Sequence, residues 1–245
     1  MCGRYVSTSS PQDLVGLFNV AHWDPAETLQ PDYNVAPTKD VWTVLERLDK
    51  ETGEIQRQLR ALRWGLVPSW AKDPSVGARM INARVETVHE KPAYRRAFAS
   101  RRCLLPADGF YEWTPLPAAE GAKPRKQPYF IAPADGSLMA MAGLYEFWHD
   151  KTRPAGDPAA WLATVTVITT EATDAAGRIH DRMPLTIGPA DADAWLDPAR
   201  TDPDELRALL RTPAGGRLTA TPVSTAVNNV RNNGPQLLEP VPEPA

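Results

Sequence analysis

The stretch VWTVLERLDKETGEIQRQLRALRW, residues 41–64, contains two runs that favour β-strands, at 41–48 and 55–64. The residues between them, 49–54, are polar and include Gly53, which is typical of a turn. We therefore predict a β-hairpin that brings the two runs side by side. Further strand-like runs lie at 103–105, 109–113, 129–132, 138–147, 161–170 and 218–223.

Short helices are predicted around these strands. Ser10, Pro11 and Asp13 provide the cap, the first-turn proline and the acidic residue that are typical of a helix start. Proline also opens the helical patterns at 92–98, 189–196 and 203–210. The 25 prolines are about twice the usual share, which disfavours an all-helical bundle.

These elements together predict an α+β fold, mainly antiparallel β, built as a distorted barrel or as packed sheets with short peripheral helices. No internal repeat or linker divides the chain, so we expect residues 1–238 to form a single domain. The remaining residues 239–245, EPVPEPA, are expected to form an extended or disordered tail. The proline-rich segment 114–127 is predicted to be a mobile surface loop.

The composition limits the classes of partner. The formal net charge is -3, so any contact with nucleic acid must come from a local basic patch. The sequence lacks a long apolar run and the apolar region of a secretory signal, which predicts a cytoplasmic protein with no membrane contact. Cys2 and Cys103 are expected to be free thiols, and neither they nor the scattered histidines have the spacing of metal ligands. We expect no cofactor.

Cys2 is informative because it directly follows the initiator methionine. Removal of Met1 would leave an α-amine and a thiol on adjacent carbons, and roughly a tenth of such an amine is neutral at pH 7. An aldehyde is the natural electrophile for this pair, because the amine can form an imine and the thiol can then close a thiazolidine ring. The alternative is that a cysteine occupies the second position incidentally.

Two further residues are candidates for proton transfer. Glu112 lies within the aromatic run 109–113, where desolvation would raise its pKa, although a strand-edge glutamate with its carboxylate in water would give the same pattern. His180 is flanked by Asp181 and Arg182 and can protonate or orient a sugar ring oxygen. A structural role for this histidine is the alternative.

The segment around residue 84 carries a polar stripe. Alternation would place Asn82, Arg84 and Glu86 on one face of an extended segment. Asn82 can then hydrogen-bond an amine or imine, and Arg84 can bind a phosphate with two N–H groups. A solvated strand face would have the same pattern.

Seven motifs, in this order along the chain, resemble those of the SRAP family, the SOS-response-associated peptidases. They are CGRY at 2–5, YNVAP at 33–37, WGLVPSW at 64–70, INARVET at 81–87, GFYEW at 109–113, IHDRMP at 179–184 and VNNVRN at 227–232. The resemblance implies a DNA-damage enzyme that senses and shields abasic sites in single-stranded DNA through a covalent thiazolidine cross-link. It also implies autoproteolytic removal of the residue ahead of Cys2.

The resemblance assigns roles to individual residues. Cys2 would form the cross-link, Asn82 and Glu112 would assist it, and His180 would promote ring opening and help to reverse the link. The residues implied in DNA binding are Arg4, Asn34, Trp70, Arg84, Trp113 and Arg182. Arginine side chains that follow the phosphates and aromatic rings that stack on bases are the combination that single-strand binding requires.

Other aromatic residues and the second cysteine are assigned to the core. Trp42, Trp161 and Trp195 lie within apolar or helical patterns, and Cys103 is expected to be a small buried hydrophobic residue.

Three functions follow from this sequence. The leading hypothesis is a monomeric abasic-site cross-linking enzyme with autopeptidase (hydrolase) and lyase-like character, cytoplasmic and associated with the nucleoid when bound to DNA. The second is a cysteine peptidase that acts in trans with Cys2 as its nucleophile. The third is a non-catalytic module that binds single-stranded DNA and does not depend on Cys2.

Overall fold

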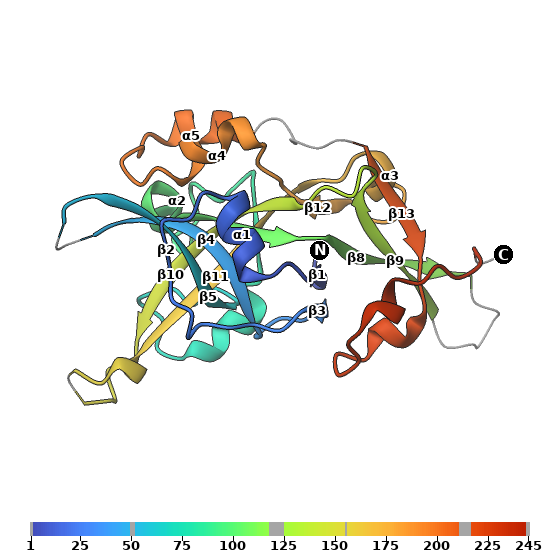
Figure 1. Cartoon of the computed structure of the whole chain (residues 1–245), viewed down its shortest axis with the longest axis horizontal. Helices are drawn as coiled ribbons and strands as arrows, with labels where there is room; N and C mark the ends of the chain where they lie inside the picture. The colour runs from blue at the N-terminus through green and yellow to red at the C-terminus, as the bar shows by residue number, and fades with distance from the viewer. Residues whose placement is uncertain (1, 50–51, 118–124, 155, 211–216, 244–245) are drawn as a thin grey trace.

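The computed structural model describes residues 2–49, 52–117, 125–154, 156–210 and 217–243 (Figure 1). Within these ranges the strands are β1 (Tyr5–Ser7), β2 (His22–Trp23), β3 (Asp32–Val35), β4 (Asp40–Leu48), β5 (Ile55–Trp64), β6 (Asn82–Arg84), β7 (Arg102–Ala107), β8 (Gly109–Leu116), β9 (Arg125–Pro133), β10 (Met139–His149), β11 (Trp161–Glu171), β12 (Arg182–Pro184) and β13 (Leu218–Pro222). The α-helices are α1 (Pro11–Leu17), α2 (Arg95–Ser100), α3 (Asp174–Gly177), α4 (Pro189–Leu196) and α5 (Pro203–Leu209), and the 3₁₀ helices are η1 (Pro74–Arg79), η2 (Pro158–Ala160), η3 (Thr225–Asn228) and η4 (Pro235–Leu238).

The larger sheet closes into a barrel. Its strands pair in the order β11–β10–β7–β4–β5, and β5 then pairs with β11 in parallel through Thr164 opposite Arg63. The other pairs of this ring are antiparallel, including the β4–β5 hairpin that the sequence predicts. The prediction of a mainly antiparallel α+β fold with a distorted barrel is therefore confirmed.

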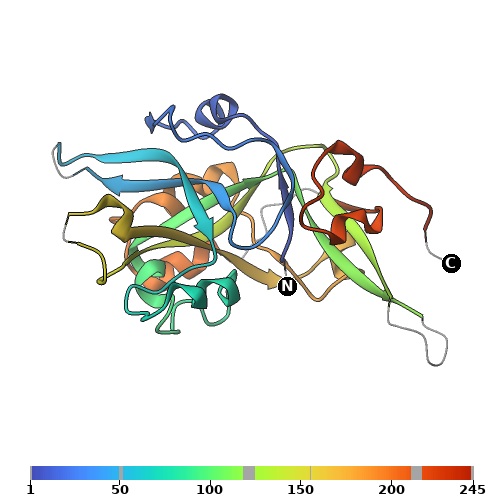
Figure 2. The same cartoon turned by 90° about the horizontal axis from the view of Figure 1, so that it is seen from below.

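The smaller sheet has the order β13–β9–β8–β1–β3 and lies beside the barrel (Figures 1 and 2). One of its faces shares a core with the barrel interior, where Cys2, Tyr5 and Phe110 pack in one cluster with Trp64 and Val165. Burial of side chains of this size gives on the order of 2 kcal/mol each, so this shared core fixes the two sheets against each other. The first residues of the chain lie at this junction.

Helices cover the outside of the barrel. A second cluster joins α1, α2, α4 and α5 to the outer face of the strands, and its largest fully buried side chain is Trp195. Ser10 caps α1 by accepting a hydrogen bond from the Asp13 N–H at 3.1 Å, as the sequence predicts. The cap is one reason that a helix of seven residues begins where it does.

The outer face of the smaller sheet is covered by the end of the described chain. Tyr111 and Val6 pack there against Val227 and Leu237 of the η3 and η4 segments. The red C-terminal part of the chain lies beside the smaller sheet in Figure 2. Val241 N–H then donates to Pro222 O at 2.9 Å, so residues near the C-terminus line the edge of β13. The domain boundary at residue 238 stays a prediction.

A close backbone contact holds the loop that follows β5. Gly65 has φ +126°, and a Cβ atom built on it would lie 2.5 Å from Gly77 O. Because both the positive φ and the contact exclude a side chain, glycine is required here. The contact brings the 65–70 loop next to η1 and leaves Trp70 at the surface, 65 % exposed.

Several local predictions are wrong. The sequence predicts a loop at 114–127, but β8 and β9 extend into it, with Thr114 opposite Gln127, because the strand pairing outweighs the prolines. Residues 118–124 lie outside the described part of the chain. Trp161 was assigned to the core and is 59 % exposed, whereas Trp42 and Trp195 are buried as predicted, as is Cys103. No helix among the described residues has the length and apolar character that crossing a membrane requires.

Candidate active site

Cys2 is completely buried at the junction of the two sheets. The Asn82 side chain fixes its backbone, because Asn82 Nδ2 donates to Cys2 O at 2.7 Å. Asn82 opens β6, which runs parallel to β11 and so reaches the barrel core. Asn82 Oδ1 is also buried and has no hydrogen-bond partner among the described residues, so it can accept from a group that binds beside Cys2.

The thiol of Cys2 is protonated at neutral pH. Burial is the main cause that raises its pKa far above the usual value, and the nearby charge of Glu112 raises it further. The hydrogen bond that the Cys2 thiol donates to Arg4 O is weak, with 4.0 Å between Sγ and the oxygen. A thiol in this state does not act as a free thiolate, so its reaction requires a base that removes the proton.

Glu112 is suited to be that base. It lies on β8, is only 4 % exposed, and points to the side of the sheet where Cys2 lies, as Phe110 does. Burial raises the pKa of Glu112 from 4.5 to about 7. A carboxyl group with a pKa near the working pH both accepts and returns protons efficiently.

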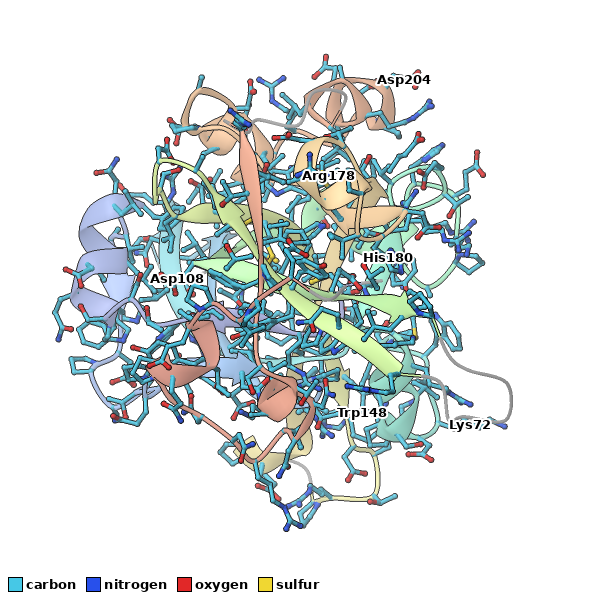
Figure 3. All side chains as sticks on the ribbon, turned by 90° about the vertical axis from the view of Figure 1, so that its right-hand side faces the viewer. Lys72, Asp108, Trp148, Arg178, His180 and Asp204 are labelled. Atoms are coloured by element: carbon cyan, nitrogen blue, oxygen red, sulfur yellow. The ribbon has the colours of Figure 1, made fainter. Side chains whose placement is uncertain are left out.

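His180 lies on the loop between α3 and β12. Thr114 Oγ1 donates to Ile179 O at 3.4 Å, which ties this loop to the strand of Glu112, and Figure 3 shows His180 below α3 and next to β8 and β9. Burial, as the main cause, lowers the pKa of His180, so the ring is mostly neutral at pH 7. The Glu112 carboxyl in turn has its pKa raised by burial first and also by the charge of Asp181, which places the two segments within electrostatic range.

The proposed DNA-binding residues fall into separate groups. In the first, Arg4 Nη1 donates to Asn34 Oδ1 at 2.6 Å, and the Arg4 guanidinium lies 5.8 Å from the centre of the Trp113 ring. Asn34 is completely buried, and its Nδ2 donates to the carbonyls of residues 227, 229 and 232. Asn34 therefore shapes the loop next to Trp113, and a direct contact with DNA stays a prediction.

The second group lies at β6 and β12. Arg84 is exposed, whereas Arg182 forms an ion pair with Glu86 at 2.6 Å. Trp70 lies on the exposed 65–70 loop, and its side chain is open to solvent. Among the residues that the structure describes, no three or more His, Cys, Asp or Glu side chains are grouped in a way that would hold a metal ion.

Sequence reasoning missed two features of this site. The first is Tyr5, whose ring packs edge-on against Trp64 with 5.2 Å between the ring centres and forms part of the apolar wall around Cys2. A single aromatic residue in a strand does not indicate such a position. The second feature is the VNNVRN motif at 227–232, where Val227 O accepts a hydrogen bond from Arg4 Nη1 and Asn228 Oδ1 accepts one from Trp113 Nε1. The density of asparagines at 228–233 was the available signal, because asparagine side chains commonly organise turns.

The comparisons with known proteins define the class. The family model described as SOS response associated peptidase (SRAP) matches residues 1–230, and the chain belongs to this family. Among its relatives, abasic site processing protein YoqW of Bacillus subtilis is 41 % identical over 239 residues, which cover 98 % of this chain and 99 % of that protein. Abasic site processing protein HMCES of Xenopus tropicalis is 32 % identical, and the match covers 97 % of this chain and 78 % of that protein.

Solved structures share the fold. A crystal structure of a protein from Bacteroides thetaiotaomicron has a TM-score of 0.76 at 22 % identity and covers 98 % of this chain and 100 % of that one. A phage-related protein from Bordetella bronchiseptica has a TM-score of 0.63 at 31 % identity, with 91 % of this chain and 94 % of that chain covered. The first similarity supports the fold alone.

Proposed function

We propose that this protein captures abasic sites in single-stranded DNA by forming a thiazolidine between the aldehyde of the site and Cys2. The observation that carries the proposal is the convergence of Asn82 and Glu112 on Cys2, one through a hydrogen bond of 2.7 Å and the other through its charge. Relatives that are named abasic site processing proteins support the same substrate.

The reaction begins after Met1 has been removed, by the protein itself or by an aminopeptidase. The free amine of Cys2 attacks C1′ of the ring-opened sugar, and loss of one water gives an imine. The thiol then adds to the imine carbon while its proton passes through Glu112 to the nitrogen, which closes the five-membered ring. Asn82 holds the residue so that amine and thiol both reach the same carbon.

His180 acts on the sugar in this scheme. An abasic sugar is mostly a closed hemiacetal, and the aldehyde forms when a proton reaches the ring oxygen as C1′ loses one from its hydroxyl. A neutral imidazole beside the site can move these protons and can also protonate the sulfur when the ring reopens. Arg4, Arg84 and Arg182 bind phosphates, and Trp70 and Trp113 stack on bases.

A cysteine peptidase that acts in trans is less consistent with this site. Such an enzyme requires an activated thiolate, and both burial and the Glu112 charge favour the protonated thiol of Cys2. The peptidase step that we retain is the single cleavage that removes Met1 and exposes the amine.

The decisive experiment incubates the purified protein with single-stranded DNA that carries one abasic site. We expect an adduct that survives denaturation, with a mass equal to protein without Met1 plus DNA minus one water. The same protein with Cys2→Ala gives no stable adduct, and neither does a variant with extra residues ahead of Cys2. Absence of the adduct at neutral pH with mature wild-type protein contradicts the proposal.

The rival functions give different results in the same assay. A non-catalytic module binds the undamaged strand equally well with or without Cys2, with an affinity that falls steeply as salt rises. A peptidase cleaves an added peptide even when its own N-terminus is blocked.

A further inference from the structure

The Arg182 side chain is held in place by three hydrogen bonds. Its Nη1 donates to Glu86 Oε1 at 2.6 Å, and its Nη2 donates to Glu86 Oε2 at 3.0 Å and to Thr169 O at 2.7 Å. The Arg182 side chain is only 14 % exposed. A bidentate pair with this additional carbonyl contact fixes the guanidinium in one plane.

The pair bridges three strands. Thr169 of β11 lies opposite Arg84 of β6 on one side and opposite Pro184 of β12 on the other. Glu86 lies two residues after the end of β6, and Arg182 begins β12, so the ion pair links the ends of the two outer strands across β11. The start of β12 is therefore anchored through a side chain as well as through its ladder.

The backbone of Arg182 contacts His180. Arg182 N–H donates to His180 Nδ1 at 3.0 Å, and Asp181 Oδ1 lies 2.8 Å from the same nitrogen. One ring nitrogen cannot serve both partners at once. It accepts from the Arg182 N–H only when it carries no proton, which leaves the proton of the neutral ring on Nε2, whereas contact with Asp181 requires a proton on Nδ1.

We propose that Glu86 is a positioning residue for His180. By fixing Arg182, it keeps the Arg182 N–H directed at Nδ1 and so selects the ring form that has its proton on Nε2 over the form that pairs with Asp181. The Asp181 side chain, which is 83 % exposed, is the competitor for Nδ1. The DNA part of this inference rests on the proposed function, because the adduct rate reports on that reaction alone.

The ring form of His180 can be measured without DNA. Ring nitrogen shifts in NMR spectra distinguish a proton on Nε2 from one on Nδ1, and a His180→Asn spectrum identifies the signal among the four histidines. We expect the neutral wild-type ring to carry its proton on Nε2. In Glu86→Gln, which cannot form the charged pair, the form with a proton on Nδ1 should rise severalfold. A wild-type ring with its proton on Nδ1 overturns the inference whether or not the variants fold.

The matched control is Glu205→Gln. Glu205 pairs with Arg200 at 3.1 Å on the surface of the α5 region, so the same chemical change there should leave His180 unaltered. In Glu86→Asp, which keeps the charge, most of the neutral His180 rings should still carry their proton on Nε2, as in wild type. If Glu86→Gln leaves the ring form and the adduct rate unchanged, Glu86 is only a surface ion pair and the inference is wrong.

The DNA assay adds a kinetic readout. Adduct formation should slow about tenfold in Glu86→Gln, with a changed pH profile, because the proton-transfer group is misaligned. Failure of the wild-type protein to form any adduct would contradict the proposed function, whereas the ring measurement would still decide the role of Glu86. The two ideas can therefore fail separately.

Discussion

Two arginines organise two regions of the molecule in different ways. Arg102, on the barrel under the helices, is 1 % exposed and donates all its guanidinium N–H groups to backbone carbonyls, those of Phe98, Ala99, Trp195, Asp197 and Arg200. Arg182, at the edge of the candidate site, instead pairs with a carboxylate and remains partly accessible. The first region joins helix ends, and the second orients a histidine.

The difference shows how this fold separates stability from chemistry. The titratable groups of the reaction scheme lie outside the helical layer, and Arg102 of β7 satisfies carbonyls that the ends of α2 and α4 leave open. The candidate site keeps a buried carboxyl with a pKa of about 7 and a buried amide oxygen with no described partner. We expect substitutions in the first region to change folding and those in the second to change the reaction.

The largest effect is expected at Glu112. Glu112→Gln keeps the shape of the side chain but removes the base, so adduct formation should slow about 10³-fold, or about 4 kcal/mol in activation free energy. Single-turnover rates on abasic DNA measure this. The control is Glu146→Gln, which should leave the rate unchanged. Glu146 is another buried acid, lies on β10 and forms an ion pair with Arg101 at 2.7 Å. Equal rates for Glu112→Gln and wild type would remove Glu112 from the mechanism.

The next effect is on folding. Arg102→Met fills a similar volume but leaves several carbonyls without donors, so the free energy of unfolding should fall by about 3 to 4 kcal/mol. Urea denaturation measures this change. The adduct rate per folded molecule should match wild type, and a rate loss beyond threefold would contradict the separation of the two regions. The free energy of unfolding of Arg102→Lys should lie between those of wild type and Arg102→Met, because lysine donates hydrogen bonds but not in the same planar arrangement.

The sequence predicts one of these regions better than the other. The barrel hairpin and the outer helical layer are predicted by the strand-like runs in 41–64 and by the helical patterns that begin with proline. Such local patterns are reliable because burying the apolar face of each element stabilises the fold. Cys2 is identified by its place behind Met1, and Asn82 and Glu112 by their local patterns and by the motifs. Their proximity, however, depends on pairings between distant segments, such as β6 with β11. Trp161 was misassigned because a strand end emerges from the core within a continuous apolar pattern.

The pH dependence of stability provides a third test. Since burial raises the pKa of Glu112 from 4.5 to about 7, the folded protein holds this proton more tightly than the unfolded chain does. The free energy of unfolding should therefore fall by up to about 3 kcal/mol between pH 4.5 and pH 8. Most of this loss should occur below pH 7, and the free energy should level off above it. The difference between wild type and Glu112→Gln in urea titrations isolates this contribution. A difference that does not vary with pH would show that Glu112 titrates normally.

The smallest effect compares two exposed tryptophans. Trp70, 65 % exposed on the 65–70 loop, and Trp161, 59 % exposed at the start of β11, both leave the core without a cavity when shortened, so neither alanine variant should lose much stability. Only Trp70→Ala should weaken binding to an undamaged strand, by about tenfold or about 1.4 kcal/mol, because a single stacked base is lost. Fluorescence anisotropy at one fixed salt concentration measures both. Equal losses in the two variants would mean that exposed aromatic area alone, and not the position of Trp70, determines the affinity. The role of Trp70 in DNA binding would then be wrong.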